Sequence, residues 1–206
     1  MNKSIFTFLI AFMFAGIMSP QAQNKNAGFL LSNNVTSFPV TGYPKVFYSQ
    51  LHPGIDFFYN LKINKKEKNQ FWLCADFGGY YHRFIQTAIR LYATVNYLNQ
   101  INQRLNLFAG LGGGYLHSFE NMTTLKLNDE GVYEVKSKLI GRPQMLIAVD
   151  LGGNYALKKD NPNSMRLQMN IRTYVQGPFV NGYVPFLPVN TFALGVSIPL
   201  TSKKKE

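Results

Sequence analysis

The chain has 206 residues, among them 17 Phe and 12 Tyr, and its formal net charge is +11. Its single cysteine, Cys74, excludes an internal disulfide and a lipid-anchored start. A basic chain with an export signal is a poor candidate for nucleic-acid binding, so anionic lipid head groups or envelope polymers are the expected partners.

Residues 1–22 have the layout of a secretory signal peptide. Lys3 precedes an apolar stretch from Ile5 to Met18, and small and polar residues follow up to Ala22. The apolar stretch is short for a membrane-spanning helix, and no later uncharged run is long enough for one. We therefore expect cleavage after Ala22, one domain over 23–200, and a basic periplasmic tail over 201–206.

The rest of the chain is dominated by apolar and polar residues that alternate with a period of two, which predicts strands. Such runs occupy 54–63, 71–80, 89–97, 105–114, 144–152, 165–175 and 191–200. Most exceed the about five or six residues of a usual soluble strand. They suit the roughly 9–11 tilted residues that cross a bilayer.

The connections between these runs alternate in kind. Compact polar turns at 64–69, 99–104 and 158–164 alternate with a tight connection near Arg83, a long segment at 119–138 and a proline-rich segment at 177–188. Short turns on one side and longer loops on the other are typical of outer-membrane barrels. An exported chain starts on the inner side, so a further strand is expected within 28–50. The sequence thus predicts an all-β, eight-stranded antiparallel up-and-down transmembrane barrel.

A soluble lipocalin-like barrel would place the apolar faces inside, and a membrane barrel would turn them toward lipid. Strand length favours the membrane barrel, as do aromatic residues at strand ends: Tyr81 and Tyr115 at the outer ends, and Phe71, Tyr97 and Tyr155 at the inner ends. The polar faces carry mid-strand charges that could pair as an ionic network in a narrow lumen: Asp56, Asp76, Arg90, Asp150, Arg166 and Arg172.

The stretch "FAGLGGGYLHS" at 108–118 places Gly110, Gly112 and Gly114 on the lumen face. An eight-stranded barrel is barely wide enough for its own side chains, so these glycines are expected to make room for bulky neighbours such as Tyr92. A dinucleotide fingerprint is excluded, because Tyr115 stands where its third glycine should be and no helix follows.

The stretches "LHPGIDFFYNL", "YYHRFIQTAIRLY" and "FVNGYVPFLPVNT", together with the strand pattern, resemble small outer-membrane β-barrel proteins of the Gram-negative envelope, in particular uncharacterised members. The resemblance extends over the whole chain from residue 23 and implies no known catalytic residues. We expect no cofactor. We expect the protein to be a monomer in contact with outer-membrane lipids.

Three histidines, His52, His82 and His117, fall near the predicted outer ends of strands and could share a metal, although ordinary solvated residues are the simpler interpretation. His117 and Ser118 invite comparison with barrel enzymes that trim lipid A. As adjacent strand residues, however, the two point to opposite faces unless a bulge intervenes.

The loop residues Phe179, Tyr183 and Phe186 could hold a protein partner or a hydrophobic ligand outside the cell. The cost of exposed apolar loops favours a lid folded over the barrel mouth. We expect a structural or interaction role through the loops at 119–138 and 177–188. The alternatives are a lipid A deacylase-like enzyme and a carrier of a small hydrophobic ligand that uses the mouth or a lateral gap.

Overall fold

The computed structural model describes residues 25–123, 125–128, 130–135, 141–159, 161, 164–180 and 183–200. The predicted signal peptide at 1–22 and the predicted basic tail at 201–206 lie outside these ranges. No helix within the described ranges has the length and apolar character needed to cross a membrane.

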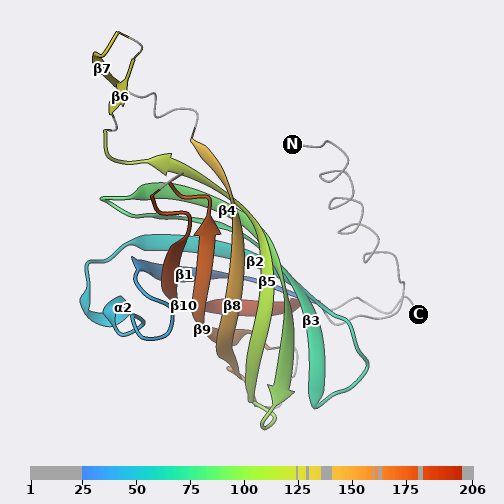
Figure 1. The fold of residues 1–206 in the computed structure, drawn as a ribbon. Coiled ribbons are helices and arrows are strands. Elements are labelled where there is room, and N and C mark those ends of the chain that lie inside the picture. Colours follow the sequence, from blue (N-terminus) through green and yellow to red (C-terminus); the bar gives the residue numbers. More distant parts are fainter. Residues whose placement is uncertain are drawn as a thin grey trace, which may run out of the picture.

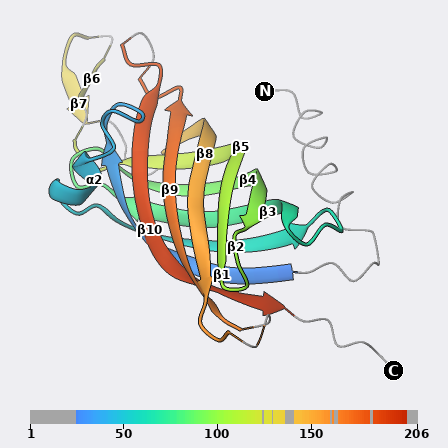
Figure 2. The ribbon, with the colours of Figure 1, turned by 90° about the horizontal axis from the view of Figure 1, so that it is seen from below.

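The described strands form a closed antiparallel barrel in the order β1-β10-β9-β8-β5-β4-β3-β2 (Figure 1; Figure 2). Its eight strands are β1 (Lys25–Thr36), β2 (Pro53–Lys62), β3 (Asn69–Tyr81), β4 (Gln86–Gln100), β5 (Leu105–Glu120), β8 (Arg142–Ala156), β9 (Arg166–Gly177) and β10 (Leu187–Leu200). A short helix, α2 (Lys45–Tyr48), follows β1. A hairpin of β6 (Leu125–Leu127) and β7 (Tyr133–Val135) projects from the connection between β5 and β8 (Figure 1).

The prediction of an eight-stranded up-and-down barrel is confirmed, and each predicted run falls on its own strand. The strand sought within 28–50 starts earlier, at Lys25, and ends at Thr36. Its pattern is weak because apolar Leu30 faces the lumen and polar Asn33 faces outward. Its ladder with β10, from Lys25–Leu200 to Thr36–Val189, closes the barrel.

The proline-rich connection is shorter than predicted. β10 begins at Leu187, inside the expected loop 177–188, because Leu187 and Pro188 pair with Gln176 and Val175 of β9. We call the end of the barrel with connections 37–52, 82–85, 121–141 and 178–186 the loop end, and the opposite end the turn end.

The apolar faces point outward. Leu91 and Val149 are each 48% exposed, whereas Arg90 and Asp150 are 1% and 2% exposed. A soluble barrel would show the reverse, so that alternative is wrong. The exposed face also carries Tyr81 and Tyr115 near the loop end, and Phe71, Tyr97 and Tyr155 near the turn end. This is the surface of a transmembrane barrel with two aromatic girdles.

Glycines on the lumen face allow close approach between strands. A Cβ at Gly114 would collide with the backbone and Cβ of Tyr92, and a Cβ at Gly152 would lie 2.5 Å from the ring of Phe108. Any side chain at these positions would displace a lumen aromatic, as expected for so narrow an interior.

Candidate functional site

Two arginines and three aspartates from five strands meet in the lumen. Arg90 on β4 donates Nε and Nη2 to the carboxylate of Asp56 on β2, at 3.0 and 2.7 Å. Arg172 on β9 binds both oxygens of Asp150 on β8, at 2.5 and 3.2 Å. Its Nη2 also donates to Asp76 on β3 at 3.3 Å, and its Nη1 lies 3.7 Å from Asp56. These bidentate, buried pairs join the five strands across the lumen.

Tyrosine rings pack against both guanidinium planes. Arg90 lies 5.5 Å from the ring centre of Tyr80 and 5.2 Å from that of Tyr174. Arg172 lies 4.9 Å from the ring centre of Tyr92. The rings stabilise the cations through their negative faces and fill space that water would otherwise occupy.

Amide side chains continue the packing toward the loop end. Gln86 Nε2 donates to Gln176 Oε1 at 3.0 Å, and Gln176 Nε2 donates to Gln144 Oε1 at 2.9 Å. On the other side of the lumen, the Thr191 hydroxyl of β10 donates to Asn34 Oδ1 of β1 at 3.0 Å. No sequence pattern predicts this amide layer, because its members are single polar residues on strands far apart in the chain.

Arg166 lies outside the ionic cluster, contrary to the sequence prediction. It opens β9 at the turn end, where its Nη1 donates to Asn154 Oδ1 at 3.1 Å. It lies six positions before Arg172 on the same strand, which is about 20 Å of extended chain. A buried cluster of Trp72, Cys74, Leu98 and Phe108 fills the lumen near the turn end.

His52 and His82 meet at the loop end. Their ring centroids are 3.6 Å apart with planes at 10°, and both side chains are buried. Burial lowers the pKa of His52, and burial followed by the neighbouring ring lowers the pKa of His82 to about 4. The pair is therefore held neutral.

The structure does not bring the third histidine to this pair. His117 lies on the outer face of β5, where its Nδ1 is 2.7 Å from the Tyr115 hydroxyl. The described residues contain no group of three or more His, Cys, Asp or Glu that could hold a metal ion.

His117 and Ser118 are also kept apart. Their pairing with Ile89 and Ala88 of β4 is continuous, so no bulge turns them to one side. Ser118 is buried in the lumen at 0% exposure. A histidine that activates a serine needs the two side chains within hydrogen-bond reach, and this pair does not provide that geometry.

The aromatic residues of the 178–186 connection do not form a lid. Tyr183 and Phe186 are 88% and 64% exposed. Phe179 is partly buried, with the Arg142 guanidinium 4.9 Å from its ring centre, and Arg142 Nη1 donates to its carbonyl oxygen at 2.6 Å. The exposed pair is therefore available for contact at the loop end.

Residues 37–52, which we call the L1 segment, fold against the outer wall of β1 and β10. Asn190 on the outer face of β10 donates to Ser37 Oγ at 2.8 Å and to the Phe38 carbonyl at 2.9 Å. Phe47 on α2 packs on Phe192, with ring centroids 5.2 Å apart. The segment also exposes large apolar side chains: Phe38, Val40, Phe47, Tyr48 and Leu51.

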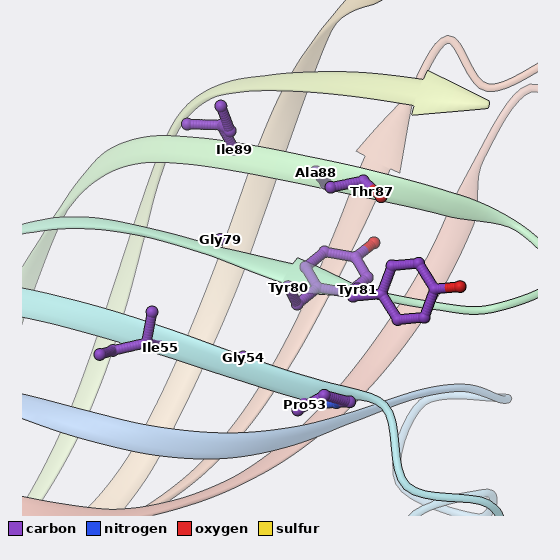
Figure 3. Close-up of a pocket in the computed structure, with 9 residues that line it drawn as sticks. All are labelled: Pro53, Gly54, Ile55, Gly79, Tyr80, Tyr81, Thr87, Ala88 and Ile89. Carbon is purple, nitrogen blue, oxygen red and sulfur yellow. The ribbon is translucent and has the colours of Figure 1, made fainter. Parts of the chain in front are cut away.

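A shallow, widely open groove of about 400 Å³ lies on the lipid-facing wall (Figure 3). The strand register places Gly79 on β3 between Ile55 on β2 and Ile89 on β4. Because Gly79 has no side chain, the wall is hollow between the two isoleucines. Tyr81 and Thr87 border the groove toward the loop end.

No protein-family model matches the sequence, and no curated protein is significantly similar to it. Among solved structures, Neisserial surface protein A (NspA) is similar, with a TM-score of 0.56 and 13% identity, covering 86% of this chain and 97% of that chain. The outer membrane enzyme PagL has a TM-score of 0.48 and 9% identity, covering 85% and 99%. Ail, the attachment invasion locus protein of Yersinia pestis, has a TM-score of 0.41 and 14% identity, covering 86% and 97%. The likeness to NspA establishes the fold alone.

Proposed function

We propose that this chain is a monomeric integral outer-membrane barrel of a Gram-negative envelope, exported by a cleavable signal peptide, which acts at its surface and not as a pore. One observation carries the proposal: charged, amide and aromatic side chains fill the described lumen, while Tyr183, Phe186 and the L1 segment expose apolar side chains at the loop end. The loop end is assigned to the cell exterior because outer-membrane barrels keep short turns on the periplasmic side.

Fractionation and conductance test this proposal. The protein is expected in the outer-membrane fraction, extractable only with detergent, and its folded form should migrate differently on a gel before and after heating. In planar bilayers it should show no stable open channel. Recovery in the soluble fraction would contradict the membrane assignment, and steady ion conductance would contradict the closed lumen.

Binding of a small hydrophobic ligand is a second candidate function, and the wall groove beside Gly79 favours it. The lipid-modifying alternative has no comparable support, because Ser118 faces the lumen and His117 the outside. Activity on lipid A that is lost in His117→Ala would favour that alternative over the surface role.

A further inference from the structure

We propose that the L1 segment is immersed in the outer leaflet of the membrane, where its exposed apolar side chains contact the acyl chains of that leaflet. The inference rests on the proposed residence of the barrel in an outer membrane. It names the partner of one part of the loop end, and it leaves Tyr183 and Phe186 as the aromatic residues available for contact outside the membrane.

The L1 segment covers polar atoms on the lipid-facing wall. Asn33 on β1 and Asn190 on β10 occupy outward positions of their strands, yet Asn190 is 0% exposed. Asn33 Nδ2 donates to the Val46 carbonyl, and Asn190 Nδ2 donates to Ser37 Oγ and the Phe38 carbonyl. An amide without such partners is costly in hydrocarbon. The segment therefore replaces a polar part of the wall with its own outer surface.

That outer surface is apolar and carries little charge. On α2, which lies beside the barrel in both views (Figure 1; Figure 2), Val46 is buried, whereas Phe47 and Tyr48 are 65% and 74% exposed. Lys45 is the only lysine, arginine, aspartate or glutamate of the segment. The connection 121–141, in contrast, contains several lysines and acidic residues. Because charges are costly in hydrocarbon, the L1 segment suits lipid and the other connection suits water.

The L1 segment also continues the lipid-facing belt of β1 and β10. Leu31 and Leu194 pair in the ladder between these strands, and both are exposed. Two residues closer to the loop end, Asn33 pairs with Phe192, and the ring of Phe47 packs on Phe192. Two residues span about 7 Å of strand, so the segment begins where the exposed belt ends. A water-soluble partner would have to reach into lipid to contact this side of the segment.

Val40 is an unusual residue for a turn that faces water. Its φ of 61° lies in the left-handed region, which is strained for a β-branched residue and favours glycine or asparagine. Its side chain is nevertheless 79% exposed. The turn gains nothing from a valine, so the apolar side chain is explained by a contact outside the protein, and acyl chains supply one.

Spin labels on the full barrel in phosphatidylcholine vesicles test the immersion. Each label reports how often it collides with oxygen relative to a water-soluble nickel complex. This ratio should be about tenfold higher at Val40→Cys and Tyr48→Cys than at Tyr183→Cys, because hydrocarbon excludes the polar complex. Leu91→Cys, on the exposed face of β4, is the reference for a position in hydrocarbon. The native Cys74 is buried and should stay unlabelled.

The reference label separates failure of the inference from failure of the proposed function. Labels at Val40 and Tyr48 that match Tyr183, while the label at Leu91 lies in hydrocarbon, would overturn the inference and leave the membrane barrel standing. A label at Leu91 that collides freely with the nickel complex would contradict the membrane barrel as well. Strong dipolar coupling between Tyr48 labels of two copies would overturn the inference by assigning the segment to a dimer contact.

A charged substitution tests the same contact without a label. Tyr48→Asp should make amide hydrogen exchange in 46–49 about fivefold faster in vesicles, which corresponds to about 1 kcal/mol for a charge held near the edge of the hydrocarbon. An aspartate is too short to reach the head groups as a lysine or arginine does. Tyr133→Asp, at a similarly exposed tyrosine of β7, is the matched control and should leave exchange in β7 unchanged. Equal effects of the two substitutions on their own segments would overturn the inference.

Discussion

Arg172 contacts three carboxylates from three different strands, and all three contacts depend on one guanidinium. Alternation predicts that Arg172, Asp76 and Asp150 share the lumen, because that pattern is local. It does not predict which of them pair, because pairing depends on strand register and on the tilt of the closed barrel. Arg166 shows this limit. Alternation correctly predicts that it faces the lumen, but it does not predict that it lies at the turn end, away from the ionic cluster.

Removal of the Arg172 guanidinium is expected to be costly. Arg172→Met should lower the free energy of unfolding by about 3–5 kcal/mol, since it leaves buried aspartates without their cation. Urea titration of the folded barrel in micelles measures this. Arg166→Met removes one partly buried hydrogen bond and should cost only about 1 kcal/mol. Similar losses in the two variants would show that the cluster contributes no special stability.

The stacked histidines give the loop end an acid-sensitive contact. Burial holds the pKa of His82 at about 4, below the ordinary value of 6.5, so the folded protein binds fewer protons than the unfolded chain between these values. The stability that the neutral pair contributes is complete above pH 6.5 and is lost as the pH falls toward 4. His82→Gln should therefore reduce the difference in unfolding free energy between pH 7 and pH 5, and an unchanged difference would contradict an acid-sensitive contact.

At the scale of elements, the L1 segment is the feature that strand patterns could not predict. Its sequence contains no periodic run, and its position depends on polar atoms that the ends of β1 and β10 turn outward. Asn33 Nδ2 donates to the Val46 carbonyl at 2.8 Å, and the Tyr43 hydroxyl donates to the Thr191 carbonyl at 2.7 Å. Two strands from opposite ends of the chain thus hold one loop.

Asn190 is expected to control how firmly the L1 segment is held. Asn190→Ala removes the amide that binds Ser37 and Phe38, so amide hydrogen exchange should become about tenfold faster or more in 37–52, as for a lost bond worth about 1–3 kcal/mol. The barrel strands should exchange as before. Asn99→Ala, at the turn end, is the control. Faster exchange throughout the barrel would instead show that Asn190 supports closure of β1 on β10.

The whole molecule depends on the outward orientation of its apolar faces. Local alternation indicates an apolar and a polar face on every strand. The exposed Val149 and the buried Asp150 show that the apolar face points outward and the polar face points into the lumen. A single strand of this kind is unstable alone, because its backbone donors and acceptors need partners on both sides. Closure of the barrel through the β1–β10 ladder provides the last of these hydrogen-bond partners.

The loss of unfolding free energy caused by an arginine on the outer face of β8 is expected to depend on how deep in the bilayer the arginine lies. Val149→Arg, near the middle of the strand, should lower the free energy of unfolding in lipid vesicles by about 2–4 kcal/mol. Leu157→Arg, just beyond the end of β8, should cost about 0–1 kcal/mol because its charge reaches the interface. Equal costs at the two positions would contradict a membrane-spanning orientation.

The sequence by itself determined seven of the eight barrel strands, their two faces and the barrel class, because period-two alternation is a property of neighbouring residues. Only the tertiary structure decided the partners of Arg90 and Arg172, the stack of His52 on His82, the amide layer, the position of the L1 segment and the groove at Gly79. Each of these joins residues from different strands. Their meeting depends on ladder register and barrel closure, and no local pattern specifies either.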